Sequence, residues 1–215
     1  MRVKHKKWAE PLLAAHPEKM ALDAAQFKGH WQERFEKVQP LHLEVGMGKG
    51  QFIIGMAKAH PEINFIGLEI ESTVAAIALK KALPEKLPNL QMIRADGAGL
   101  ETFFTDGSIE RIYLNFSDPW PKTRHEKRRL TYKSFLANYQ RVLKPGGGLE
   151  LKTDNMGFFE YSLTSFNNYG LVFDGVWLDL HHAAENEGNV ETEYEQRFAA
   201  LGQPIYKVKA HFKAE

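Results

Sequence analysis

The amino-acid sequence predicts an α/β fold: a mostly parallel seven-stranded sheet with helices on both faces and an antiparallel strand at its C-terminal end. Short apolar stretches alternate with longer segments of helical periodicity, and strands linked by helices pair in parallel. With 215 residues, 43% of them apolar, the chain is long enough for one sizeable core. No internal repeat or linker interrupts it. We therefore expect one domain over residues 39–215, preceded by an arm over residues 1–38.

Each strand is predicted from a run of apolar or β-branched residues that ends at a turn signal. Leu41–Val45 is such a run and leads directly into glycines. The last two runs alternate apolar and polar residues, which is typical of an antiparallel pair that closes a sheet. In chain order, the strands are expected at residues 41–45, 63–70, 89–95, 109–116, 149–153, 171–180 and 205–212.

Helices are predicted between these strands, at residues 52–59, 72–83, 100–104, 132–143 and 158–167. Ser72 is a suitable N-cap for the second of them. The run Lys144-Pro145-Gly146-Gly147-Gly148 cannot continue a helix, so the fourth helix should stop before it. In the first 38 residues Pro11, Pro17 and Gly29 interrupt helix formers, which indicates an arm with short helices.

Composition excludes several kinds of site. The chain has no cysteine, which rules out disulfides, thiolate metal ligands and a cysteine nucleophile. The pair His181-His182 lies at a predicted strand end without a third ligand at useful spacing, so we expect a surface pair and no metal. No apolar run approaches a membrane span or a signal peptide. We expect a soluble, cytoplasmic protein that is a monomer or a homodimer.

A glycine-rich loop follows the first predicted strand, in the sequence Glu44-Val45-Gly46-Met47-Gly48-Lys49-Gly50. Position 51 is glutamine, so the dinucleotide fingerprint is incomplete. Two further acids end the next two strands: Glu69, with Glu71 as a competitor, and Asp96. Since ligands bind at the carboxyl edge of open α/β sheets, these acids should meet there. Spacing and acids together resemble the class I S-adenosylmethionine methyltransferases.

The segment Asn115–Arg129 combines a rigid, aromatic first half with a dense basic second half. Asp118 lies between the end of a strand and two prolines, with Trp120 beside it. Although the net charge is only +1, local basic patches rather than net charge attract a polyanion. An acid and a ring beside a cationic strip indicate a site for a base in a nucleic acid. Trp120 is as readily a buried structural residue as a stacking platform.

The motifs resemble those of the bacterial tRNA (guanine-N7-)-methyltransferase family over nearly the whole chain. They are Met1-Arg2-Val3-Lys4, the Glu44 loop, Phe116-Ser117-Asp118-Pro119-Trp120-Pro121-Lys122, Lys152-Thr153-Asp154 and Thr192-Glu193-Tyr194-Glu195. The resemblance implies methyl transfer from S-adenosyl-L-methionine to N7 of guanine at position 46 of the tRNA variable loop.

The resemblance also assigns expected roles. The cofactor side would be contacted by Glu44, Gly46, Glu69, Asp96 and Asp118. The substrate would be contacted by Lys122, Asp154, Thr192, Glu193, Tyr194 and Glu195. The RNA would be contacted by Arg124, His125, Glu126, Lys127, Arg128 and Arg129. Thr192 and Glu195 also match a capping box at a helix start, and both roles are compatible.

Asp118 is the expected catalytic residue. Guanine N7 has an in-plane lone pair, so the reaction needs alignment and electrostatic stabilisation more than a base. The Asp118 carboxylate would either stabilise the charge that develops on the ring or accept hydrogen bonds from the guanine N1 and N2 edge. Asp154 and Glu195 are further candidates for that edge.

Two other functions stay open at this stage. A class I methyltransferase acting on a small molecule or a protein would share the glycine loop, but the basic run beside Asp118 argues against it. A non-catalytic RNA-binding module could retain the fold, but the intact acids at the strand ends argue against lost cofactor binding.

Overall fold

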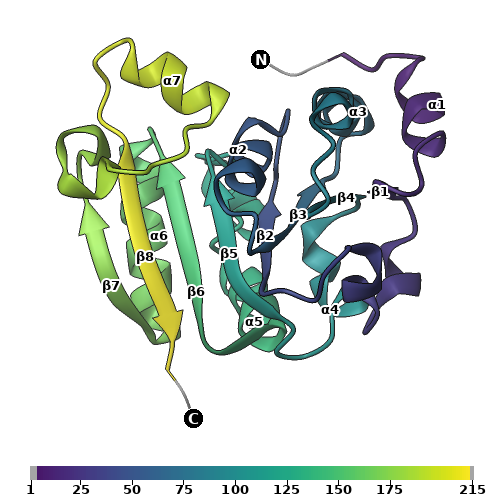
Figure 1. Cartoon of the computed structure of the whole chain (residues 1–215). Coiled ribbons are helices and arrows are strands. Elements are labelled where there is room, and N and C mark those ends of the chain that lie inside the picture. Colours follow the sequence, from purple (N-terminus) through teal and green to yellow (C-terminus); the bar gives the residue numbers. More distant parts are fainter. Residues whose placement is uncertain (1–3, 214–215) are drawn as a thin grey trace.

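The protein is built around one eight-stranded sheet, with strand order β1-β4-β3-β2-β5-β6-β8-β7 (Figure 1). The computed structural model describes residues 4–213. The strands are β1 (Met20–Ala21), β2 (Leu41–Val45), β3 (Asn64–Glu69), β4 (Leu90–Arg94), β5 (Ile109–Asn115), β6 (Leu143–Thr153), β7 (Leu171–Trp177) and β8 (Tyr206–Phe212). Among the strands of residues 4–213, β8 alone points in the opposite direction to the rest, which confirms the predicted antiparallel C-terminal strand.

The count of seven strands is wrong by one, because the arm contributes a strand. β1 pairs in parallel with β4, Met20 beside Met92 and Ala21 beside Ile93. A two-residue strand is too short to show alternation, so the sequence gives no sign of it. The residues Met1, Arg2 and Val3 of the basic start lie outside the described part of the chain. The boundary between arm and domain at residue 38 stays a prediction.

Helices cover both faces of the sheet, as predicted. They are α1 (Ala9–Ala14), α2 (Gln51–Ala59), α3 (Ser72–Ala82), α4 (Leu100–Phe103), α5 (Lys133–Val142), α6 (Met156–Tyr169) and α7 (Glu193–Ala199). The side chains of α1, α2 and α3 form one core with β3 and β4. Those of α5 and α6 form the other, with β2, β5 and β6. No helix in residues 4–213 is long and apolar enough to cross a membrane.

Most predicted ends agree with the structure to within one or two residues, but two local predictions are wrong. α5 stops before the glycine run, as predicted, but the strand expected at residues 149–153 already begins at Leu143: Leu143 pairs with Ile109, and the register shifts before Gly148 pairs with Arg111. Ser72 is the first residue of α3 and not its cap. Its hydroxyl donates to Glu10, which draws it away from the helix N-terminus.

The topology determines where a site can form. β2, β3, β4 and β5 are parallel, so all four end at the same edge of the sheet. α7 lies beyond that same edge, near the ends of β5 and β6 (Figure 1). Loops that are distant in sequence therefore meet at one place.

Candidate active site

A cavity of about 700 Å³ opens at the carboxyl edge of the parallel strands. It brings together, from the predicted site, Glu44, Gly46, Glu69, Asp96, Asp118, Lys127, Arg128, Thr192, Glu193 and Tyr194. Outside its lining lie Lys122, Asp154, Glu195, Arg124, His125, Glu126 and Arg129. The acids of the predicted cofactor side and the Asp118 turn thus share one cavity.

The glycine loop forms the floor because its backbone takes conformations that other residues avoid. Gly46 and Gly50 have φ angles of 82° and 81°, in the left-handed region. A Cβ on Gly50 would lie 2.9 Å from the Cβ of Ala78, so the loop also packs too closely on α3 for a side chain. The main chain at this turn is consequently bare toward the cavity.

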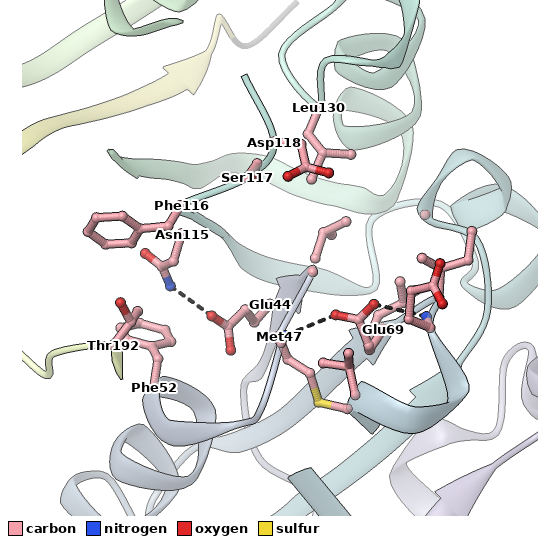
Figure 2. Close-up of a pocket in the computed structure, with 18 of the residues that line it drawn as sticks. Glu44, Met47, Phe52, Glu69, Asn115, Phe116, Ser117, Asp118, Leu130 and Thr192 are labelled. Atoms are coloured by element: carbon pink, nitrogen blue, oxygen red, sulfur yellow. Dashed lines mark hydrogen bonds between the residues drawn. The ribbon is translucent and has the colours of Figure 1, made fainter. Parts of the chain in front are cut away.

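Glu44 is a buried acid on this floor, with only 1% of its surface exposed. One carboxyl oxygen accepts a hydrogen bond from the Asn115 side chain at 2.9 Å (Figure 2). The other is buried and has no hydrogen-bond partner among the described residues. Burial raises the pKa of Glu44 to about 8. An unpartnered buried oxygen is costly, so this side chain is suited to a cation or a donor that enters the cavity.

Asn115 was missed as a site residue. It ends β5 and is buried, and it fixes the orientation of the Glu44 carboxyl. A polar residue that closes an apolar strand next to the glycine-loop strand is the signal that would have identified it.

Glu69 is buried at the end of β3 and is fixed by two main-chain donors. Its carboxylate accepts from the amide of Gly48 at 3.0 Å and from the amide of Glu71 at 2.9 Å (Figure 2). Burial raises its pKa above the usual value. Glu71 is exposed and supplies only its amide to this arrangement. Glu69 rather than its competitor therefore provides a fixed carboxylate at this edge.

Asp96 has a more open position after β4. Its side chain is exposed and accepts a hydrogen bond from the Ala98 amide at 2.9 Å, which caps the 3-10 turn Gly97–Gly99. One oxygen of its carboxylate is thereby used for the turn. Asp96 lines the cavity together with Gly97 and Ala98.

The Asp118 turn is held in an unusual backbone conformation. Phe116 and Trp120 have positive φ angles of 51° and 40°, which costs a non-glycine residue roughly 1–3 kcal/mol. Two contacts offset this strain. The Phe116 amide donates to the Lys152 carbonyl at 2.8 Å, and the Arg129 guanidinium donates to the carbonyls of Pro119 and Trp120 at 3.1 Å each. The exposed Asp118 carboxylate projects from this turn beside the cavity (Figure 2).

The basic run forms a 3-10 helix over Thr123–Arg128, and its side chains divide into two groups. Arg124 and Lys127 are exposed. Arg128 lies over the Trp120 ring at 4.9 Å, and Arg129 lies over the Tyr161 ring at 4.0 Å. Arg129 is therefore part of the turn's framework, whereas Arg124, Lys127 and Arg128, which are exposed, can contact a polyanion.

Trp120 is half-buried and has packing partners on two sides. The His125 ring meets it edge-on with centroids 5.7 Å apart, and Arg128 covers it. The ring also lines the cavity, so it joins the basic helix to the cavity wall.

The start of α7 closes the remaining side of the cavity. The predicted capping box is confirmed: the Thr192 hydroxyl accepts from the Glu195 amide, and the Glu195 carboxylate accepts from the Thr192 amide. Glu193 forms ion pairs with Lys49 of the glycine loop, at 3.1 Å, and with Lys81 of α3. These two lysines hold its pKa below the usual value against the effect of burial. Tyr194 is 45% exposed at the mouth.

Three predicted substrate residues lie away from the cavity lining. Glu195 is fully buried and pairs with Lys152 at 2.6 Å. Asp154 is half-buried at the end of β6, and burial raises its pKa. Lys122 is exposed at the start of the basic 3-10 helix.

The prediction of a surface histidine pair is half wrong. His182 is exposed, but His181 turns inward and shares a hydrogen bond of 3.0 Å with the Glu195 carboxylate. The acid that draws it in lies 14 residues away, which no local pattern reveals. No group of three or more histidine, aspartate or glutamate side chains within residues 4–213 could hold a metal ion.

Comparison with solved structures agrees with the fold. The chain superposes on a 16S rRNA methyltransferase, KamB, with a TM-score of 0.61 at 15% identity, over 89% of this chain and 94% of the other. This likeness establishes the class I methyltransferase fold that the glycine loop and sheet order suggest.

Comparison of sequences establishes the family. A family model described as a putative methyltransferase matches residues 38–208. A tRNA (guanine-N(7)-)-methyltransferase of Limosilactobacillus fermentum is 81% identical over 99% of each chain. One from Limosilactobacillus reuteri is 75% identical over 99% of this chain and all of the other. Together with the glycine loop, the strand-end acids and the Asp118 turn, these matches show that the chain belongs to the tRNA (guanine-N(7)-)-methyltransferase family.

Proposed function

We propose that this protein transfers a methyl group from S-adenosyl-L-methionine to N7 of a guanine in tRNA, at position 46 of the variable loop. One observation supports this most directly. One cavity is lined both by the buried Glu44 carboxyl, one oxygen of which has no hydrogen-bond partner, and by the exposed Asp118 carboxylate, whose turn continues into the basic 3-10 helix. The Glu44 side of the cavity suits the methyl donor, and the Asp118 side suits a base in RNA.

The residues present suit S-adenosylmethionine. The unpartnered oxygen of Glu44 offers an acceptor to an ammonium group, and Glu69 offers a fixed carboxylate to the ribose hydroxyls. Asp96 and the bare turn after it would border the adenine. Gly46 exposes main chain without a side chain in the way. When bound, the donor supplies an electrophilic methyl group on a sulfonium.

The chain's own part in the reaction is alignment and electrostatics. N7 attacks through its lone pair, so no residue has to remove a proton from it. Asp118 is the group that would touch the guanine, and its carboxylate would stabilise the positive charge that the ring acquires. The same carboxylate can accept hydrogen bonds from the N1 and N2 edge. Because N7 faces the groove, the base has to leave its stack to reach this site.

The roles of the α7 start and of the basic helix are part of the same proposal. Thr192, Glu193 and Tyr194 would contact the guanine nucleotide from the α7 side, with Lys122 and Asp154 further out on the approach. Glu195 would support this substrate side from the protein interior, because its carboxylate is fully buried. The exposed side chains of Arg124, Lys127 and Arg128 would bind phosphates, with His125 and Glu126 shaping that helix and Arg129 bracing the turn. A tRNA substrate implies a cytoplasmic enzyme.

The decisive experiment incubates the protein with labelled S-adenosylmethionine and bulk tRNA and identifies the modified nucleoside. We expect label in 7-methylguanosine at the variable loop. Label on small amines or proteins instead of tRNA would indicate another class I methyltransferase. Calorimetric titration with the donor adds a second readout: tRNA binding without any donor binding would indicate a non-catalytic RNA-binding module and overturn the proposal.

A further inference from the structure

The segment Asn189–Glu195, here called the rim segment, forms the α7 side of the cavity and is fastened to the sheet by one side chain. Lys152 of β6 donates to Asn189 at 3.0 Å, to the Val190 carbonyl at 2.9 Å and to the Glu195 carboxylate at 2.6 Å. These three acceptors satisfy all three protons of the ammonium group. The rim residues Thr192 and Glu193 lie between two of these anchor points.

Glu195 completes the fastening from the rim side. Its carboxylate also accepts from the Asn189 side chain at 2.7 Å and shares a hydrogen bond with His181 at 3.0 Å. Burial alone would raise the pKa of Glu195, but Lys152, Asn189 and His181 together hold it below its usual value. The acid is consequently ionised, and every contact it makes fixes the position of the rim segment.

Lys152 also touches the opposite wall of the cavity through its main chain. Its carbonyl accepts from the strained Phe116 amide, two residues before Asp118. The two sides of the acceptor region therefore share one residue: the side chain of Lys152 sets the rim segment, and its backbone sets the Asp118 turn.

A purely stabilising role explains this arrangement poorly. Replacing a buried ion pair by apolar side chains is often neutral or stabilising, so such a pair needs another reason to be kept at this place. The other lysine pairs of the rim segment, from Glu193 to Lys49 and Lys81, involve side chains that are 30% to 43% exposed. Surface pairs of this kind are weak and screened by salt. The buried pair is the firm attachment.

We propose that Lys152 is a positioning residue for methyl transfer: acting through Asn189, Val190 and Glu195, it holds Thr192–Tyr194 at the height over the cavity that aligns guanine with Asp118. The inference rests on the proposed function and adds a residue that touches neither the donor nor the base.

The test is Lys152→Met compared with a matched control, Lys207→Met. Lys207 is the cross-strand partner of Lys152 on β8, is also buried and pairs with Glu150 at 3.3 Å. When Lys207 is replaced, Glu150 keeps its ion pair with Arg111, and Glu185 keeps its ion pair with Lys209. Both variants should melt at lower temperature. Steady-state kinetics with tRNA and hydrogen exchange of residues 189–195 are then measured for each, at the same interval below its own melting temperature.

We expect the Lys152 variant alone to lose at least about tenfold in kcat/KM for tRNA, the amount that misalignment of a bound substrate readily produces. It should also lose exchange protection in the rim segment. Equal kinetics in the two variants, or a loss of activity with unchanged rim protection, would overturn the proposal. Methylation of tRNA by wild-type protein and by Lys207→Met tests the overall function independently of this outcome.

A double variant, Lys152→Met with Glu195→Gln, distinguishes the loss of rim-segment positioning from the effect of an unpaired buried charge. It removes the uncompensated carboxylate that the single change leaves behind, so the melting temperature should recover toward wild type. Activity and rim protection should stay low, because the neutral pair cannot fasten Asn189 and Val190. Recovery of wild-type turnover in this variant would show that only the charge balance matters and would contradict the positioning role.

Discussion

The donor half of the cavity, made of Glu44, Glu69 and Asp96, and the acceptor half, made of the Asp118 turn and the rim segment, are held by different kinds of contact. Glu69 and Asp96 each accept from an amide two residues further along the chain. The acceptor half depends on contacts across 36 residues, from Phe116 to Lys152, and across 43 residues, from Lys152 to Glu195. The donor half thus combines two local turns with two longer contacts, from Glu69 to Gly48 and from Glu44 to Asn115, whereas the acceptor half relies on Lys152 to join its two walls.

Asp118→Ala should break the acceptor half most severely. The change removes the one carboxylate on the turn that faces the guanine site, and we expect methyl transfer to tRNA to fall on the order of 100- to 1,000-fold. The side chain is exposed, so the fold should be retained; donor affinity should fall less than the rate of transfer, because Asp118 is expected to contact the cofactor side as well. Single-turnover rates, circular dichroism and calorimetric titration with S-adenosylmethionine check the three expectations. Undiminished turnover would remove Asp118 from the mechanism; Asp118→Asn, which keeps the shape, should fall nearly as far.

Glu44→Gln should damage the donor half and leave the acceptor half intact. A charge-assisted hydrogen bond contributes roughly 1.5–3 kcal/mol, so affinity for S-adenosylmethionine should drop by about 10- to 100-fold. Binding of tRNA without the donor should be unchanged, which a fluorescence titration can confirm. Weakened tRNA binding would show that the two halves are not separable as described.

The same substitution has a pH-dependent effect on stability. Burial raises the pKa of folded Glu44 from 4.5 to about 8, so the folded protein binds a proton that the unfolded chain has released. Free energy of unfolding is therefore lost as pH rises from about 4.5 to about 8. Glu44→Gln should remove this loss and be more stable than wild type at pH 8, by on the order of a few kcal/mol, but not at pH 4. Urea melts of donor-free protein at both pH values measure this, and a constant difference would contradict it.

Neutralising the exposed basic side chains should change binding rather than chemistry. With Arg124 and Lys127 both replaced by Gln, the slope of log K against log salt should become shallower by about 1–2, since each phosphate contact contributes a little less than one unit. The turnover number at saturating tRNA should be nearly unchanged. Arg129→Gln is the matched comparison: it should lower turnover because it releases the Pro119 and Trp120 carbonyls, with a smaller effect on the slope. Equal slopes in the double variant and in wild type would exclude a phosphate role.

Thr192→Ala should have the smallest effect. It removes the hydroxyl of the capping box and should lower stability by roughly 0.5–2 kcal/mol. Thermal melts measure the change, and Thr192→Ser, which keeps the hydroxyl, should restore most of it. A loss of turnover in the Ser variant would indicate that the side-chain methyl group of Thr192 contacts the substrate.

Much of the donor half could be predicted from the sequence, because the positions of its acids at strand ends are local features. An acid directly after a buried strand is carried to the sheet edge by the strand itself, so strand-end positions alone bring Glu44, Glu69 and Asp96 together. The parallel pairing of most strands followed from the alternation of strands and helices for the same reason. Asn115, the donor-side residue that was not predicted, also ends a strand and differs from these three residues only in carrying an amide instead of an acid.

The acceptor half was predicted in content but not in arrangement. The motif residues could be named, yet nothing local shows that Arg129 turns back onto its own turn or that His181 and Glu195 meet. Such contacts depend on which loops the fold brings together. The two-residue strand β1 was missed for a related reason, since its pairing with β4 joins residues about 70 positions apart, which no periodicity records.

That short strand has a consequence for solubility. β4 would otherwise be the outermost strand on its side, with unpaired main-chain groups open to other molecules, and such edges promote aggregation. β1 pairs with part of that edge, and the Lys19 ammonium donates to the carbonyls of Leu87 and Leu90 nearby. A chain shortened by its first 22 residues should therefore self-associate even where its fold and cavity are unharmed. β1 thus covers part of an edge at which strands of other molecules could pair.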